Sequence, residues 1–72
     1  MTPIEQGFHD GATKANQLRD DHGLSGLARR NWRHEAAKDG GAQQHGFRDL
    51  GDIETYYRAY VIGAMTAVEE MT

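Results

Sequence analysis

The segment LGDIETYYRAYVIGAMTAVEEM, residues 50–71, decides the fold of this chain. Its apolar residues recur at alternating spacings of three and four, which is the pattern of one face of an α-helix. The stripe consists of Leu50, Ile53, Tyr57, Tyr60, Ala64, Ala67 and Met71. Either Asp49 or Asp52 is a suitable N-cap, because its carboxylate can accept the first free backbone N–H groups. The sequence therefore predicts a long amphipathic helix over residues 49–71.

A first helix is predicted at the start of the chain, over residues 3–22. Thr2-Pro3-Ile4-Glu5 has the pattern of a capping box with proline at the first helical position. The apolar residues that follow keep helical spacing, and they are Ile4, Phe8, Ala12, Ala15 and Leu18. Gly23 is a suitable residue to end this helix, because glycine is the usual residue just after a helix C-terminus.

A second helix is predicted over residues 25–39, with Ser25 as its cap and Asp39-Gly40-Gly41 as its end. Residues 40–48 contain three glycines and no periodic pattern, so we interpret them as a loop that Phe47 fastens to the core. The predicted fold is a small three-helix domain of the all-α class.

Small residues form a row in the first predicted helix and another in the last. Gly7, Gly11 and Ala15 are spaced by four, and so are Ala59, Gly63 and Ala67. Glycine inside a helix costs about 1 kcal/mol relative to alanine, so such rows indicate a close approach of two helix backbones. We expect the first and last helices to cross at these rows.

The last helix carries more apolar surface than its stripe. Val61, Ile62 and Met65 lie outside the stripe, which predicts burial on two sides of the helix. A chain of 72 residues has a thin core, and without cysteine it has no disulfide to support that core. We therefore expect the last helix to bind either a second copy of the chain, as a homodimer, or a docked partner. The residues predicted for self-association are Ala59, Ile62 and Met65.

A basic cluster stands out in the middle of the chain, although the formal net charge is -3. Residues 25–48 carry five basic and two acidic side chains. The expected basic face consists of Arg29, Arg30, Arg33 and Lys38. It has two interpretations: the guanidinium groups bind the phosphates of a nucleic acid, or they pair with acidic residues of the terminal helices. Trp32 lies on the apolar side of the same helix and is the expected core anchor.

No catalytic, cofactor or metal motif occurs in the sequence. Ser25 lacks the glycine two residues later that a nucleophile elbow requires, and no phosphate-binding glycine loop is present. The four histidines include no pair at a spacing of four residues, the spacing that places two metal ligands on one helix face. We therefore expect a chain that is not an enzyme and that uses no cofactor and no metal.

The function expected from these features is that of a small regulator or inhibitor that covers a site on a larger protein. Phage-encoded inhibitors, including anti-CRISPR proteins, are often small, acidic and free of cysteine, and the comparison rests on size and charge alone. The acidic residues expected to face such a partner are Asp49, Asp52, Glu54, Glu69 and Glu70. The alternatives are a nucleic-acid or ribosome-associated adaptor that uses the basic face, and a structural homo-oligomer.

The expected location is the cytoplasm. The chain has no cysteine and no leader pattern, and its longest nearly unbroken apolar run, residues 59–68, is shorter than the roughly 20 residues needed to span a bilayer.

Overall fold

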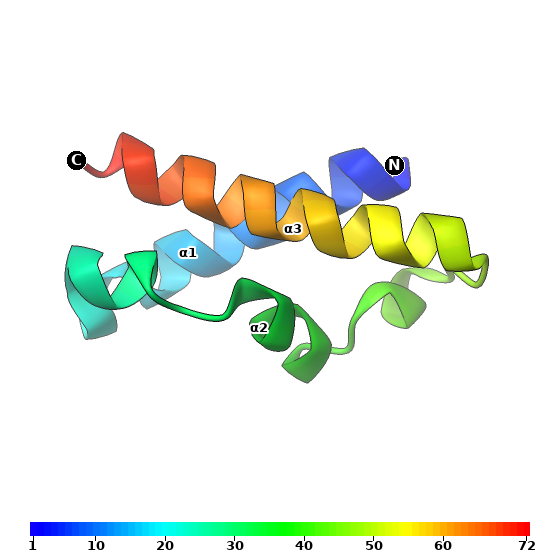
Figure 1. Cartoon of the computed structure of the whole chain (residues 1–72), viewed down its shortest axis with the longest axis horizontal. Coiled ribbons are helices and arrows are strands. Elements are labelled where there is room, and N and C mark those ends of the chain that lie inside the picture. Colours follow the sequence, from blue (N-terminus) through cyan, green and yellow to red (C-terminus); the bar gives the residue numbers. More distant parts are fainter.

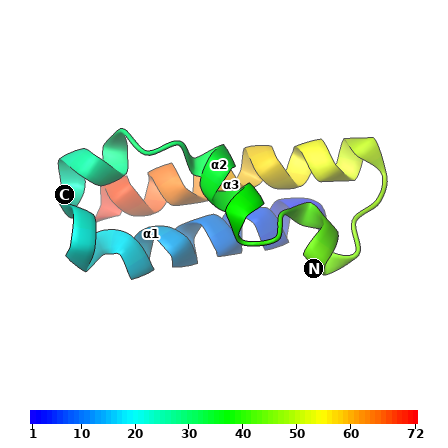
Figure 2. The same cartoon turned by 90° about the horizontal axis from the view of Figure 1, so that it is seen from below.

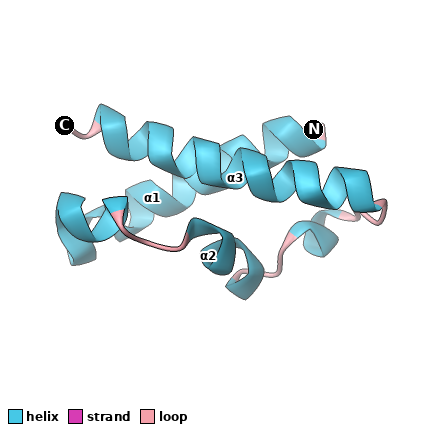
Figure 3. Cartoon of the chain, viewed as in Figure 1, coloured by secondary structure: helices cyan, strands magenta, loops and turns pink.

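The computed structural model describes all residues, Met1 to Thr72, and contains helices without any strand. The elements are α1 (Pro3–Ala28), α2 (Trp32–Lys38), the short 3-10 helix η1 (Ala42–His45) and α3 (Leu50–Glu70). The molecule is elongated, with extents of 35 × 20 × 15 Å. Figures 1 and 3 show α1 and α3 as the two long helices of the fold. The prediction of a small all-α domain with three helices is confirmed.

The two long helices run side by side in the same direction. Gly7 of α1 packs against Tyr56 and Ala59 of α3, and Gly11, one turn later, packs against Tyr60 and Ala64. The segment that connects the end of α1 to the start of α3 must therefore run back along the length of the molecule. Figures 1 and 2 show that α2 and η1 make this return along one side of the pair.

The predicted crossing of the glycine rows is confirmed. A Cβ atom added at Gly7 would overlap the carbonyl oxygen of Tyr56, and one added at Gly11 would overlap that of Tyr60. From the other helix, a Cβ at Gly63 would overlap the carbonyl oxygen of Phe8. The absence of side chains at these positions is what lets the two backbones touch.

The predicted start of α1 is confirmed. Thr2 is the N-cap, its hydroxyl accepts from the backbone N–H of Glu5 at 3.2 Å, and the Glu5 carboxylate accepts from the N–H of Thr2 at 2.9 Å. Both bonds satisfy N–H groups that have no partner within the helix. The local pattern therefore determines this helix end without help from the rest of the fold.

The predicted boundary between the first and second helices is confirmed in part. Gly23 has non-helical angles, φ 65° and ψ 169°, so a kink there ends the first helical stretch, and a second stretch continues to Ala28 within α1. The second break, before α2, was not predicted. Asn31, and not Ser25, is the N-cap of α2, and its side chain accepts from the N–H of His34 at 3.1 Å. The predicted second helix, 25–39, is thus divided between the last turn of α1 and the seven residues of α2. The physical reason is that the Asn31 side chain offers the backbone a cap of its own, which favours a break just before α2.

The segment 40–48, predicted to be a loop, contains η1 between glycines of positive φ. Gly40, Gly41 and Gly46 have φ of 108°, 64° and 84°. Phe47 is partly buried against the core, as predicted. This segment carries the chain from the end of α2 to the start of α3.

The N-cap of α3 is Asp49, whose carboxylate accepts from the N–H groups of Gly51 and Asp52 at 2.9 and 3.2 Å. In the predicted apolar stripe Tyr60, Ala64 and Ala67 are buried. Ile53, Tyr57 and Met71 are partly buried, and Leu50 is 82% exposed. Tyr56 lies outside the predicted stripe and is nonetheless almost fully buried.

The core lies between α1, α2 and α3. Trp32 is 2% exposed, so its predicted role as core anchor is confirmed. The buried cluster consists of Ala15, Leu27, Trp32, Ala36, Ala42, Tyr56, Tyr60, Ala64, Ala67 and Val68. Many of these side chains are small, so the core is thin and its contacts depend on close backbone packing. No helix has the length and apolar character needed to cross a membrane.

Candidate functional site

The basic face predicted from the sequence is largely occupied by ion pairs within the chain. Arg33 binds Glu54 of α3 through both of its terminal nitrogens, with N–O distances of 2.6 and 3.2 Å. Its guanidinium carbon also lies 4.9 Å from the centre of the Tyr57 ring. The hydrogen bond between the two side chains raises the pKa of Arg33 and lowers the pKa of Glu54.

Two further cations of the basic face converge on one buried carboxylate. Arg30 Nε lies 3.1 Å from Glu35 Oε1, and Lys38 Nζ lies 3.8 Å from the same oxygen. Glu35 belongs to α2, so this part of the pairing takes place beside α2 and not with the terminal helices as predicted. Of the four predicted residues, only Arg29 is exposed without an ion pair.

The predicted acidic residues do not lie together. Asp49 and Asp52 lie at the start of α3, whereas Glu69 and Glu70 lie at its end. At about 1.5 Å per residue, the 17 steps from Asp52 to Glu69 separate the two groups by roughly 25 Å. Glu54 is engaged by Arg33 and by Arg58, whose Nε lies 3.2 Å from the Glu54 carboxylate. The five carboxylates therefore form two separate acidic ends and one internal pair.

The residues predicted for self-association have three different environments. Ile62 is 58% exposed. Met65 is partly buried and packs against the core, and Ala59 is buried where α3 meets Gly7 of α1. In the single chain only Ile62 offers a large free apolar surface.

Ile62 is part of a wider apolar surface, which we name the outer face and define as Ile4, Phe8 and Ile62. Ile4 and Phe8 are one turn apart on α1 and are 62% and 41% exposed. The Phe8 backbone packs directly on Gly63, the neighbour of Ile62, so these side chains lie on adjoining parts of α1 and α3. Sequence reasoning assigned Ile4 and Phe8 to the core, because periodicity does not distinguish the two edges of a stripe.

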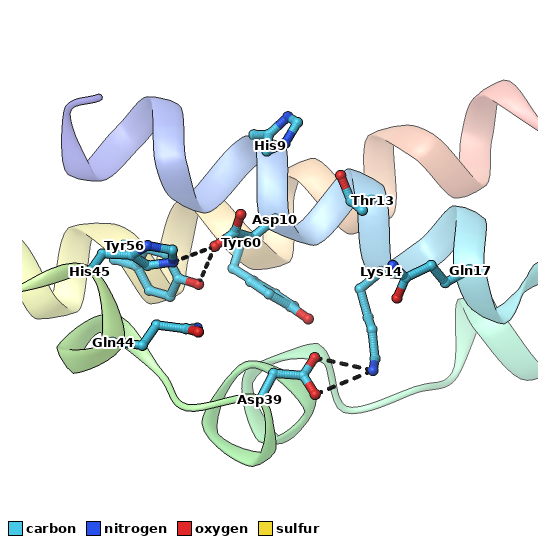
Figure 4. Close-up of a pocket in the computed structure, with 10 residues that line it drawn as sticks. All are labelled: His9, Asp10, Thr13, Lys14, Gln17, Asp39, Gln44, His45, Tyr56 and Tyr60. Carbon is cyan, nitrogen blue, oxygen red and sulfur yellow. Dashed lines mark hydrogen bonds and ion pairs between the residues drawn. The ribbon is translucent and has the colours of Figure 1, made fainter.

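A polar hollow of about 230 Å³ lies on the other side of α1 (Figure 4). Residues from α1, from η1, from α3 and from the end of α2 line it. They are His9, Asp10, Thr13, Lys14, Gln17, Asp39, Gln44, His45, Tyr56 and Tyr60. Asp10 and Phe8 are separated by roughly 200° around α1 at about 100° per residue, so the hollow and the outer face point in different directions.

Asp10 is the centre of the hydrogen bonds in the hollow. Its Oδ2 lies 2.7 Å from His45 Nε2 and accepts from the Tyr56 hydroxyl at 2.7 Å, while its Oδ1 accepts from Gln6 Nε2 at 2.9 Å. Burial, and secondly the bond to Asp10, raise the pKa of Tyr56 far above its usual value. The Asp10 carboxylate thus fastens η1 and α3 to α1 and has three hydrogen-bond partners within the chain.

Tyr60 forms the floor of the hollow and differs from Tyr56 in one respect. It is 2% exposed, and its hydroxyl has no hydrogen-bond partner. Burial raises the pKa of Tyr60 far above its usual value, and the charges of Asp39, Glu35 and Asp10 raise it further. Figure 4 shows this hydroxyl directed towards Asp39 and Lys14, which are joined across the hollow by an ion pair of 3.1 Å. A buried hydroxyl without a partner is rare and costs roughly 1–3 kcal/mol.

The side chains that line the hollow supply hydrogen-bond donors and acceptors and charges of both signs. No group of three histidine, cysteine or acidic residues is placed to hold a metal ion. Sequence analysis did not predict the contact between His45 and Asp10, because the two residues lie 35 positions apart. Only the position of Gly11 in the α1–α3 crossing could have indicated that Asp10 lies near α3.

Comparison of the chain with models of protein families, with curated proteins and with solved structures finds no match.

Proposed function

We propose that this chain is a non-enzymatic binding protein that docks its outer face on a larger protein and so regulates or inhibits that protein. The observation that carries the proposal is the exposure of Ile4, Phe8 and Ile62, which are 62%, 41% and 58% exposed on adjoining surfaces of α1 and α3. Burying a large apolar side chain contributes about 1.5–3 kcal/mol, so three of them supply a strong driving force for association.

The charges around the outer face favour a partner with a basic border. Glu5 follows Ile4 on α1 and is exposed. Glu69 lies seven residues after Ile62, which is two helical turns on the same side of α3, and it is exposed too. The formal net charge of the chain is -3. The expected partner surface is therefore an apolar patch bordered by lysine or arginine.

The pairing of the basic face supports a protein partner over a nucleic acid. Binding to phosphates requires several free cations that converge, and each neutralised phosphate contributes to the affinity. Arg33, Arg30 and Lys38 are engaged with Glu54 and Glu35 inside the chain. To bind phosphates they would have to leave these carboxylates, and Glu35 would be left buried without a cation.

The test compares the wild-type chain with the double variant Ile4→Glu/Ile62→Glu. Proteins that co-purify from the native host are identified, and each candidate is then produced in pure form for an affinity measurement. Leu50→Glu is the control, because Leu50 is 82% exposed at the far end of α3 and the change replaces an exposed apolar side chain by one of the two negative charges that the double variant adds. Circular dichroism checks that the variants fold.

We expect the double variant to weaken binding of the pure partner at least tenfold and Leu50→Glu to leave it unchanged. Equal binding by all three proteins would refute the proposal. Light scattering tests whether the partner is a second copy of the chain. In that case the wild type is a dimer and the double variant is a monomer. The proposal of a larger partner would then be wrong.

A further inference from the structure

The polar hollow has one buried polar atom that the fold leaves unused. The Tyr60 hydroxyl is enclosed, has no hydrogen-bond partner and points into the hollow (Figure 4). By contrast, the Asp10 carboxylate beside it has three donors. The Tyr60 hydroxyl is therefore the polar group of the hollow whose hydrogen-bonding capacity the fold leaves entirely unused.

The second atom group open to a ligand is the Asp39 carboxylate. Its side chain is 43% exposed, and its only partner is Lys14 of α1, whose side chain is 21% exposed. Pairs that water can reach contribute little, typically about 0.2–1 kcal/mol, so a competing cation can replace Lys14 at small cost. Asp39 is therefore exchangeable in a way that Asp10 is not.

The electrostatic character of the hollow favours a positive ligand. Asp39, Glu35 and Asp10 all lie close enough to Tyr60 for their charges to act on its hydroxyl. Lys14 is the one lysine or arginine that lines the hollow, beside the imidazoles of His9 and His45.

We propose that the hollow binds a primary ammonium group, with Asp39 and the Tyr60 hydroxyl as its acceptors. An ammonium has three donors and no acceptor, so it can bond to both oxygens at once and still reach water. The group can come from a small free amine or from a lysine side chain of a peptide. This site is independent of the outer face, which lies on the other side of α1.

The test is a titration of the isotope-labelled chain with n-butylamine, followed by amide chemical shifts in NMR spectra. A second arm uses a lysine-containing peptide with blocked ends, which separates the free amine from the peptide as source. Acetate and n-butanol serve as the anionic and neutral probes. We expect both amine probes, or one of them, to shift the amides around Asp39, Gln44 and Tyr60 with a millimolar dissociation constant.

Three variants distinguish a site for an ammonium group from a site for an anion, because the two kinds of site predict opposite changes in affinity. Lys14→Met removes the competing cation, so the amine should bind about two- to fivefold more tightly. Asp39→Asn and Tyr60→Phe should each weaken it. Lys14→Met keeps most of the length of the Lys14 side chain and removes its charge, so it keeps the test valid if Tyr60→Phe does not fold. Two results would overturn the proposal. The first is amide shifts caused by acetate that disappear in Lys14→Met, which would indicate an anion site. The second is a spectrum that neither amine probe changes, which would mean that the hollow holds water alone.

Discussion

The α-carbon of Gly11 lies against the backbone carbonyl of Tyr60, and a Cβ atom built on Gly11 would overlap both the oxygen and the carbon of that carbonyl. The obstacle is backbone and not a flexible side chain, so neither partner can turn aside. This contact is the tightest point of the α1–α3 crossing and brings Asp10 and Lys14 next to the floor of the hollow.

The change Gly11→Ala is expected to lower the free energy of unfolding by about 1–3 kcal/mol, because α1 must move away from α3 to make room for the methyl group. Urea unfolding followed by circular dichroism measures the loss. The matched control is Gly26→Ala, also within α1, where the nearest atom to the new methyl is the His22 Cβ at 3.4 Å. There we expect no loss, or a gain of about 0.4–1 kcal/mol from the stiffer unfolded chain. Equal effects at both sites would contradict the close packing.

The bend at Gly23 gives a second prediction. Its φ of 65° and ψ of 169° belong to a region that is essentially restricted to glycine, and no atom lies near a Cβ built there. Any loss in Gly23→Ala is therefore due to backbone strain and not to a clash, and we expect about 1–3 kcal/mol. Asparagine tolerates the left-handed helical region, where ψ is near +47°, but not this one. Gly23→Asn should therefore be as unstable as Gly23→Ala in thermal unfolding, and a clear rescue by asparagine would show that the bend is not required.

Local patterns predicted the elements that depend on neighbouring residues. The capping box at Thr2 and Glu5, the stripe of α3 and the glycine rows each need only three- or four-residue spacings, and each was confirmed. The break before α2 was missed because Ser25 and Asn31 are both good caps, and the choice between them depends on where α2 can pack. The sequence favours neither residue strongly.

The contacts of the candidate site depend on how the helices are arranged in space, and the spacing of residues along the sequence does not show that arrangement. Asp10 meets His45 only because the return segment places η1 beside α1, and Arg33 meets Glu54 only because α2 lies beside the first turns of α3. The sequence left two interpretations of the basic face open, phosphate binding and internal pairing, and the charges alone did not identify the acidic partners. Tyr60 was predicted as a core residue, and its unsatisfied hydroxyl became visible only with the packing around it.

The pair of Arg33 and Glu54 predicts how the chain responds to acid. The hydrogen bond from Arg33 lowers the pKa of Glu54 below its ordinary value of 4.5 in the folded state. The pair therefore stabilises the fold at pH values above that ordinary pKa, and the contribution is lost as the pH falls through the lowered one. In an NMR titration of the side-chain carboxyl, Arg33→Met should raise the pKa of Glu54 towards 4.5.

An internal reference for this titration is Glu5. Its pKa is also lowered, in this case by hydrogen bonds with Thr2, which Arg33 does not touch. Arg33→Met should therefore leave the titration of Glu5 unchanged. A Glu54 titration that is the same in the wild type and in Arg33→Met would show that the two side chains are not paired in solution. High salt should weaken the pair in the same direction as the variant, because both side chains are exposed enough to be screened.

Tyr56 and Tyr60 predict the response to alkali, with the opposite sign. Burial raises the pKa of both hydroxyls above the ordinary value of 10.0, so the folded chain keeps two protons that the unfolded chain loses. Their contribution to stability is complete below about pH 10 and is lost as the pH rises towards the folded values. Each tyrosine should reduce the free energy of unfolding by about 1.4 kcal/mol per pH unit in this range. Urea unfolding at several pH values above 10 gives the total slope, to which the lysines also contribute. Tyr60→Phe should reduce that slope by the share of one tyrosine, and an unchanged slope would mean that the Tyr60 hydroxyl ionises in the folded chain.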